Sequence, residues 1–526
     1  MRQWVSFIGV HCLEPMSTPT LPFPFANWQL QEQWAQSLPM DANTSPKPRP
    51  VDSMGAFVQP TPVATPHLLA ASAKLCQSLQ FDPRVLAEPV FAPVLTGNTT
   101  FKGFRSYATN YGGHQFGNWA GQLGDGRAIV IAELRNAKGE RQELQLKGAG
   151  LTPFSRFADG RAVLRSSVRE YIASEAMHAL GVPTSRALWL ASTGDSVVRD
   201  RYYDGHPEPE PGAVVCLVAL SGIRFGHFEL PAARGDTALV RQLADFCIAK
   251  DFPHLQSHRD ENRYGDWFRE ICERTARMIA HWQAVGFVHG VMNTDNMSVL
   301  GLTIDYGPFG FMDRFDSQWT PNTTDHAQRR YRYAQQPAVG FWNLQRLAMA
   351  LGSLFPDPEP LREGLMHYQH LFVAEDLRMQ SAKLGLTSYP KDVVQGFAEL
   401  LQAQALDFRL AYLALQFNGD LAETSYLERP DQAAINLWLA DYRVARASHA
   451  APFAHNSRLL PHNWLLQELI ESTEQATAQS RQASDLHLYL QAMDTPTTTR
   501  YPSHWGQMRP DWASERRGCT DLSCSS

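Results

Sequence analysis

The chain has 526 residues, and its 47 lysines and arginines against 53 aspartates and glutamates leave a formal net charge of −6. Hydrophobic residues make up 44% of the chain and aromatic residues 11%, enough to bury large cores, which excludes wholesale disorder. The slightly acidic balance argues against a nucleic-acid partner, because such proteins usually carry a basic excess. No apolar run approaches the ~20 residues that span a bilayer, so we expect no membrane partner either.

Seven cysteines are scattered along the chain, without a C-x-x-C pair or a Cys/His cluster at zinc spacing. This distribution is typical of a reducing compartment, and we expect a cytoplasmic protein. Residues 1–10 resemble a signal peptide only faintly, since the apolar stretch is short and no small-residue cleavage site follows. An N-terminal extension, with Met16 as the true start, is the favoured interpretation. Cys519 and Cys524 lie in a polar tail, where we expect exposed and reactive thiols.

The N-terminal half of the chain predicts an extended arm followed by a mostly β unit. Residues 1–60 are rich in proline, threonine and serine, which is typical of an arm. A helix is expected at residues 68–79, and a glycine-rich stretch occupies residues 101–127. Strands are expected at residues 128–134, 143–147, 187–192 and 213–220, with one helix at residues 161–180 that ends at a Gly-Val-Pro stop signal.

After about residue 230 the pattern becomes helical. Residues 269–285 place apolar side chains on one face at helical spacing, and helical patterns dominate again from residue 341 to about residue 490. A short hairpin is expected at residues 299–304. The predicted organisation is an arm (1–60), a β-rich unit with one key helix (61–230), an α-helical unit (231–490) and a tail (491–526).

Four polar residues at the junction of the two units occur in the order that a kinase-type site requires. Lys147 lies on a strand, Glu170 on the following helix, and Asn296 and Asp305 on opposite sides of the expected hairpin. A strand lysine neutralises phosphate, a helix glutamate holds that lysine, and the asparagine and aspartate chelate the metal on the phosphates. The sequence therefore predicts an α+β, bilobal protein-kinase-like fold, with a β-rich N-lobe and a mostly α-helical C-lobe.

Glycines and arginines near the lysine strand fit a phosphate-binding site. Glycine lets backbone N–H groups approach phosphate oxygens, and arginine geometry suits phosphate. The candidates are Gly124, Gly126 and Arg127 before the strand, Asp159, Gly160 and Arg161 before the helix, and Arg165 and Arg224.

The expected catalytic loop departs from the kinase pattern. Kinases carry an aspartate two residues after the loop histidine, but Val291 stands there after His289. Asp295, directly before Asn296, is the nearby carboxylate that could accept a proton instead. Ordinary kinase chemistry is therefore doubtful, and the residues alone do not distinguish transfer of phosphate from transfer of a nucleotide.

Several long strings resemble the selenoprotein O family: YGGHQFG at residues 111–117, LKGAG at 146–150, TPFSR at 152–156, RFGHFE at 224–229, HGVMNTDNM at 289–297, DYGPFG at 305–310 and the final Cys-Ser-Ser. The resemblance covers roughly residue 60 to the C-terminus. It implies a pseudokinase that binds ATP in a flipped orientation and transfers AMP to Ser, Thr or Tyr hydroxyls of proteins.

The resemblance also implies roles for individual residues. Asp295 would be the catalytic base, Asn296 and Asp305 would bind Mg²⁺ or, alternatively, Mn²⁺, and Glu170 would pair with Lys147. The nucleotide would contact Gly124, Gly126, Arg127, Lys147, Asp159, Gly160, Arg224 and Asp305.

Two positions depart from the family pattern. Leu217 stands where the family usually has a phosphate-binding arginine, for which Arg199 or Arg201 is a candidate substitute. Pro321 stands where some bacterial members carry a cysteine that pairs with the tail cysteine, so redox locking through that bond is doubtful. A bond between Cys519 and Cys524 is a speculative replacement.

Two other functions stay open at this stage. Val291 and Leu217 suit a nucleotide-binding pseudokinase scaffold that has lost catalysis. The His289-Gly290 pair is also found in small-molecule phosphotransferases, although Val291 argues against that chemistry.

Overall fold

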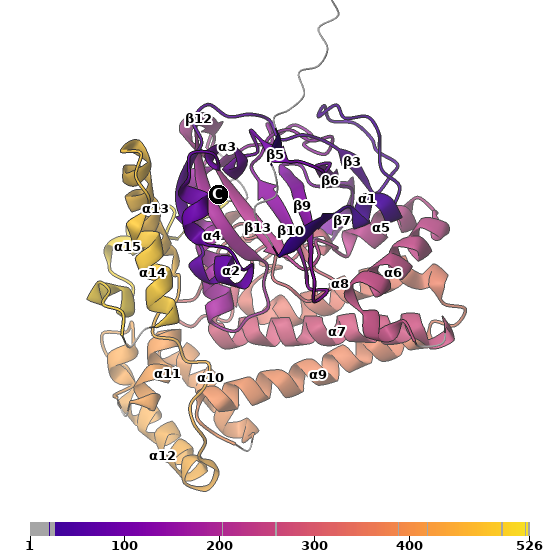
Figure 1. Cartoon of the computed structure of the whole chain (residues 1–526). Helices are drawn as coiled ribbons and strands as arrows, with labels where there is room; N and C mark the ends of the chain where they lie inside the picture. Colours follow the sequence, from indigo (N-terminus) through magenta and orange to yellow (C-terminus); the bar gives the residue numbers. More distant parts are fainter. Residues whose placement is uncertain are drawn as a thin grey trace, which may run out of the picture.

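The computed structural model of the chain describes residues 20–21, 27–201, 204–257, 260–387, 389–417, 419–495, 498–520 and 522–523. The fold is mixed α/β: a large, mainly antiparallel sheet in the N-terminal part is followed by a predominantly helical part (Figure 1). In the described part of the chain, no helix combines the length and the apolarity needed to cross a bilayer.

The main sheet has nine strands; at its centre β9 and β13 carry runs of aliphatic side chains that favour strands, while β10 between them alternates Leu144 and Leu146 with polar residues. Its order is β3 (Gly55–Phe57), β6 (Tyr107–Thr109), β9 (Ala128–Asn136), β10 (Arg141–Lys147), β13 (Glu208–Ala219), β12 (Arg186–Arg199) and β4 (His67–Ala71), with β2 (Trp28–Gln31) on β9 and β11 (Ala162–Val163) on β13. Three two-stranded pairs lie outside it: β1 (Thr20–Leu21) with β5 (Thr100–Phe101), β7 (Gly112–Gln115) with β8 (Asn118–Gln122), and β14 (Phe287–Val288) with β15 (Gly310–Phe311).

The helices lie beside and below the sheet in Figure 1. Those of the N-terminal part are α1 (Gln33–Ser37), α2 (Ala73–Ser78), α3 (Ala92–Leu95) and α4 (Leu164–Ala179). The helical part contains α5 (Gly226–Ala233), α6 (Thr237–Asp251), α7 (Asp260–Val285), α8 (Gln336–Leu351), α9 (Glu359–Lys383), α10 (Lys391–Ala403), α11 (Phe408–Gln416), α12 (Gln432–His449), α13 (Asn463–Ala478), α14 (Ser484–Asp494) and α15 (Trp512–Glu515).

Helix α4 joins the sheet to the helical part. Most of its side chains are buried, because it packs on β12 and β13 with one side and on α13 and α14 with the other. It ends where Gly181 takes a φ of +77°, a conformation that costs glycine little. The buried guanidinium of Arg169 stacks on the Phe309 ring at 4.4 Å and donates to the Phe309 carbonyl oxygen at 2.6 Å. Helix α4 thereby fixes the segment that follows Asp305.

The structure confirms the strands expected at residues 128–134, 143–147, 187–192 and 213–220, the helix at 161–180 and the helical pattern at 269–285. The helix expected at residues 68–79 is wrong in its first half. Residues 67–71 form β4 and pair with β12, and only residues 73–78 are helical. An apolar run this short fits either structure, and pairing with β12 decides it.

Two further expectations are wrong. Residues 28–57 are not an extended arm, because they supply β2, α1 and β3, and the buried rings of Trp28 and Trp34 attach them to the core. The hairpin at residues 299–304 does not form, since its flanks pair elsewhere: Ser298 bridges to Arg224 and Thr303 bridges to Thr184.

The tail also differs from expectation at Cys519. Its side chain is buried, and burial raises the pKa of its thiol to about 11, so it is not the exposed and reactive group that was expected. Leu522 forms a parallel bridge with Asn322, and its N–H donates to the Pro321 carbonyl oxygen at 3.3 Å. The tail therefore reaches the Pro321 segment, while Cys524 lies outside the described residues and its pairing stays a prediction.

Candidate active site

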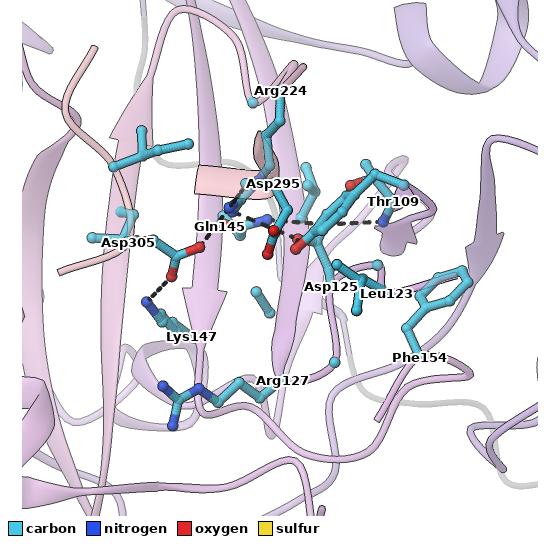
Figure 2. A pocket seen from close by; sticks show the side chains of 18 of the residues that line it. Thr109, Leu123, Asp125, Arg127, Gln145, Lys147, Phe154, Arg224, Asp295 and Asp305 are labelled. Carbon is cyan, nitrogen blue, oxygen red and sulfur yellow. Dashed lines mark hydrogen bonds and ion pairs between the residues drawn. The ribbon is translucent and has the colours of Figure 1, made fainter. Parts of the chain in front are cut away.

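A cavity of about 750 Å³ opens between the main sheet, the loop that precedes α5 and the loops that follow α7. Figure 2 shows its side chains converging from β10 and from the segments around residues 224, 295 and 305. It is lined by ten of the eleven expected site residues: Gly124, Gly126, Arg127, Lys147, Asp159, Gly160, Glu170, Arg224, Asp295 and Asp305. The structure thus brings together groups that are as far apart in sequence as Gly124 and Asp305.

Lys147 is the centre of an ion-pair network in this cavity. It is the last residue of β10, and its Nζ donates to Glu170 Oε1 at 2.8 Å and to Asp305 Oδ1 at 2.7 Å. Arg224 donates to the other oxygen of Asp305 (Figure 2). Burial alone would raise the pKa of Asp305, but Lys147 and Arg224 outweigh burial and hold this pKa well below its usual value. Asp305 is therefore ionised.

Asp305 also has an unusual backbone. Its φ of +61° lies in the left-handed region, which residues other than glycine rarely occupy. Such a conformation costs of order 1–3 kcal/mol and persists only where the surroundings enforce it, most often at functional sites.

Asp295 lies opposite Asp305, on a single 3-10 turn spanning Thr294–Asn296. Gln115 donates to its Oδ2 at 3.2 Å, while its Oδ1 is buried and has no hydrogen-bond partner among the described residues. Burial raises the pKa of Asp295 to about 7, although Arg224 and Gln115 both act to lower it. Arg224 joins the two aspartates, because its Nη1 donates to the Asp295 carbonyl oxygen at 2.8 Å as well as to Asp305.

Asn296 is the one residue, among the eleven to which the family resemblance gives a role, that does not line the cavity. Its amide nitrogen donates to the Val291 carbonyl oxygen at 2.9 Å, which leaves its Oδ1 as the atom that can bind a metal. The described residues hold no cluster of three or more His, Cys, Asp or Glu side chains suited to a metal. The amide Oδ1 of Asn296 and the ionised carboxylate of Asp305 fit a hard cation that takes few protein oxygens and completes its shell with phosphates and water.

The β7–β8 hairpin lies directly against Asp295. A Cβ at Gly113 would come within 2.8 Å of Asp295 Oδ1, so only glycine fits there. The His114 N–H donates to Thr294 Oγ1 at 2.7 Å, and the Phe116 N–H donates to Asn293 Oδ1 at 3.1 Å. The glycine-rich stretch thus forms a cover for the catalytic loop, which its composition alone did not indicate.

Several polar residues that line the cavity were not predicted from the sequence, among them Tyr111, Gln115 and Asp125. Gln115 and Tyr111 belong to or border the hairpin, and Asp125 sits between Gly124 and Gly126. Asp125 is buried and accepts from the Thr109 N–H at 3.0 Å and from the Thr109 hydroxyl at 2.6 Å. An acidic residue between two glycines was the available signal for Asp125, but nothing local to Gln115 marks its contact with Asp295.

The glycines near the cavity make room for a loop of the protein. A Cβ at Gly124, whose φ is +76°, would lie 2.4 Å from Phe154, and one at Gly126 would lie 2.9 Å from the Phe154 carbonyl oxygen. Gly160 similarly allows close approach of Gly150. Their immediate effect is to let the Phe154 loop close one side of the cavity.

The arginines separate into cavity and structural groups. Arg127, Arg161 and Arg224 line the cavity, whereas Arg165 is absent from its lining and forms a bidentate pair with Glu210, both N–O distances being 2.9 Å. The expected phosphate role of Arg165 therefore has no support.

Leu217 lines the cavity, as does Arg199, whose guanidinium is held by Asp159 at 2.7 and 2.8 Å. Arg201 is absent from the lining and donates to Gln467. Of the two candidate substitutes for the missing arginine, Arg199 is the one at the cavity.

The cavity combines cations with carboxylates, of which one is ionised and one has an oxygen without a partner. A transferase that acts on a metal-bound nucleotide requires this combination. Comparison with known proteins places the chain within that class. A family model described as "Protein adenylyltransferase SelO" matches residues 50–493. The chain belongs to the SelO family of protein adenylyltransferases.

Relatives similar over nearly their whole length carry a consistent name. A protein nucleotidyltransferase YdiU of Xanthomonas campestris pv. campestris strain 8004 is 48% identical over 522 residues, covering 95% of this chain and 99% of the relative. The YdiU protein of Xanthomonas axonopodis pv. citri is 48% identical over 514 residues, covering 93% and 98%. That of Xanthomonas oryzae pv. oryzae strain MAFF 311018 is 47% identical over 520 residues, with the same coverage.

Proposed function

We propose that this protein transfers AMP from ATP to serine, threonine or tyrosine hydroxyls of other proteins and releases pyrophosphate. The family supports the activity, and one observation carries the site: Lys147, Arg224, Asp295 and Asp305 converge in one cavity. We assign to it a bilobal protein-kinase-like fold, in which β2, α1 and β3 belong to a β-rich lobe that continues to residue 230, followed by a helical lobe at 231–490 and a tail after residue 490. A reducing cytoplasm suits the five described cysteines, all of which are unpaired.

In this mechanism the acceptor hydroxyl oxygen attacks the α-phosphorus of ATP, and the bond from that phosphorus to the bridging oxygen of pyrophosphate breaks. Asp295 accepts the hydroxyl proton, for which its orphaned Oδ1 is the available atom. Lys147, held by Glu170, and Arg127 neutralise the charge that collects on the departing pyrophosphate.

Asn296 and Asp305 would hold Mg²⁺, or Mn²⁺ in its place, through one amide and one carboxylate oxygen. When bound, the cation supplies positive charge to the phosphate oxygens. Lys147 and Arg224 both contact Asp305 in the structure, which supports a role for these two cations in contacting phosphate oxygens beside the metal.

The direct test compares ATP labelled on the α-phosphate with ATP labelled on the γ-phosphate, in the presence of Mg²⁺ and a lysate of acceptor proteins. We expect the α-label to enter protein and the γ-label to remain in solution. Entry of the γ-label would assign a phosphotransferase, and failure of folded enzyme to transfer the α-label to itself or to any acceptor would contradict the proposal.

The alternative is a nucleotide-binding scaffold without catalysis, which Val291 favours because an apolar side chain stands where kinases have their base. It predicts that ATP raises the melting temperature equally in the native protein and in Asp295→Asn, with no label transfer in either. The adenylyltransferase proposal predicts the same stabilisation by ATP but label transfer only in the native protein.

A further inference from the structure

Four arginines outside the nucleotide cavity form a cationic surface beside the catalytic loop. Arg329, Arg330 and Arg332 lie in the segment that leads into α8, and Arg346 lies on α8. Two of them stack on one indole, since the Cζ atoms of Arg330 and Arg346 lie 4.6 and 4.9 Å from the centroid of Trp342. We call these four residues, together with Trp342, the arginine surface.

The charges of the arginine surface are not neutralised by the chain itself. Within the described ranges, none of the four forms an ion pair with a carboxylate. The carboxylate of Asp325 interacts electrostatically with Arg330, but its hydrogen bonds come from the backbone N–H groups of Arg330 and Tyr331, at 2.9 and 2.7 Å. In a chain with a net charge of −6, four unpaired cations in one place are a local excess that favours an anionic partner.

This surface adjoins the catalytic loop through the β7–β8 hairpin. The Tyr331 hydroxyl donates to Asn293 Oδ1 at 2.7 Å and accepts from the Phe116 N–H at 3.0 Å. A Cβ at Gly117 would lie 3.5 Å from Arg330 Cζ, and Gly117 is two residues from Gln115, which contacts Asp295. An extended peptide rises about 3.3–3.6 Å per residue, so a few residues would reach from Asp295 to these cations.

Aromatic rings continue the path from the hairpin to the arginines. The exposed Trp119 of β8 lies 5.2 Å from the His114 ring, and His114 lies 5.5 Å from Trp342, measured between centroids. The four arginines are absent from the lining of the nucleotide cavity, so the triphosphate of ATP does not explain them.

We propose that the arginine surface binds an acidic segment of the acceptor protein, next to the hydroxyl that receives AMP. This inference rests on the proposed function and adds a substrate class to it: hydroxyls flanked by glutamate or aspartate. Trp119 and Trp342 would contact the apolar parts of the same segment, and the guanidinium groups would pair with its carboxylates.

The test uses two synthetic peptides, each with one serine, one threonine and one tyrosine, flanked by glutamates in one peptide and by glutamines in the other. With the full chain, Mg²⁺ and α-labelled ATP, we expect kcat/KM to be about tenfold higher for the glutamate peptide at low salt. The preference should shrink as ionic strength rises, because exposed charges are screened beyond about 10 Å at 0.1 M salt.

Variants then assign the preference to this surface. The double variant Arg329→Gln/Arg346→Gln should lose the preference without a change in the KM for ATP, whereas Arg329→Lys/Arg346→Lys should keep most of it. Arg443→Gln, at an exposed arginine on α12, is the matched control and should behave like the native protein. Equal melting temperatures would show that the variants fold.

Equal labelling of the two peptides would overturn the inference while leaving the proposed function supported. A rise in the KM for ATP in the double glutamine variant would also overturn it, because it would assign the arginines to the nucleotide. If no α-label entered either peptide or any protein acceptor, the proposed function itself would fail, and the inference with it.

Discussion

The two walls of the cavity are built in different ways. The sheet wall carries Arg127, Lys147 and Arg199, which stand at the ends of the regular strands β9, β10 and β12. The loop wall carries Arg224, Asp295 and Asp305, which lie in irregular segments held by isolated bridges and side-chain hydrogen bonds. Backbone geometry fixes the cations at the strand ends. In the loop wall, by contrast, Asp305 has an unusual backbone conformation and Asp295 is a buried carboxylate.

The largest expected effects come from removing one ionic group from each wall. Lys147→Met and Asp305→Asn should each lower AMP transfer by at least about a hundredfold, because both act on charge that develops in the transition state. Only Asp305→Asn should also remove most of the Mg²⁺ dependence of nucleotide binding. Label transfer and nucleotide titrations with and without Mg²⁺ measure the two effects.

Lys102→Ala is a suitable control for these variants, since Lys102 is exposed and outside the cavity. Near-native transfer by either Lys147→Met or Asp305→Asn would show that the ionic network serves stability and not catalysis, and the assignment of that wall would be wrong.

A smaller effect is expected for Gln115, which links the hairpin to the loop wall. Gln115→Leu should lower kcat by about tenfold with little change in the KM for ATP, because it removes the hydrogen bond that orients Asp295. Gln115→Glu should be more damaging, since it sets a second carboxylate against Asp295. If the leucine variant were fully active, the contact between hairpin and base would have no role in catalysis.

A variant of Arg199 tests whether this arginine replaces the phosphate-binding arginine that the family usually has at the position of Leu217. Arg199→Gln should raise the KM for ATP by about fivefold, because one phosphate-directed cation is lost. Arg201→Gln is the matched control, since Arg201 lies outside the cavity, and ATP titration of each variant measures the difference. Equal KM values for these two variants would assign Arg199 to its pairing with Asp159 alone.

The sequence predicts the sheet wall better than the loop wall. The alternation of leucines with polar residues in β10 and the Gly-Val-Pro stop after α4 mark Lys147 and Glu170 by local pattern, and the structure has both on the expected elements. Asp295 and Asp305 were found through their motif, but the hairpin expected between Asn296 and Asp305 was wrong because its flanks pair with Arg224 and Thr184. Such pairing joins segments that are far apart in the sequence, so the local hydrophobic pattern does not predict it.

The roles of Gln115 and of the arginine surface could not be predicted from the sequence for the same reason. Their contacts with the rest of the site join segments about 180 residues or more apart, as in the hydrogen bonds from Gln115 to Asp295 and from Phe116 to Tyr331. A polar residue in a glycine-rich stretch, or an arginine run before a helix, carries no sign of such partners. Fold-level packing decides which of these side chains reach the site.

The smallest expected effect concerns His227, which lies on α5 and contacts Arg224 of the loop wall. Its Nδ1 accepts from the Arg224 N–H at 2.9 Å, and burial, followed by the charge of Arg224, lowers the pKa of His227 to about 3 from 6.5. Between these values the unfolded chain binds a proton that the folded chain does not, so the free energy of unfolding falls as pH falls, by about 1.4 kcal/mol per pH unit.

His227→Asn should remove this one-proton slope, since asparagine keeps an acceptor near the Arg224 N–H but does not titrate. Urea unfolding at about pH 7 and about pH 5 would measure it: we expect the native protein to lose roughly 2 kcal/mol more than the variant over that interval. His206→Asn, at an exposed histidine, should retain the native slope. An unchanged slope in His227→Asn would mean that His227 takes up its proton in the folded state, and that its environment beside Arg224 admits water.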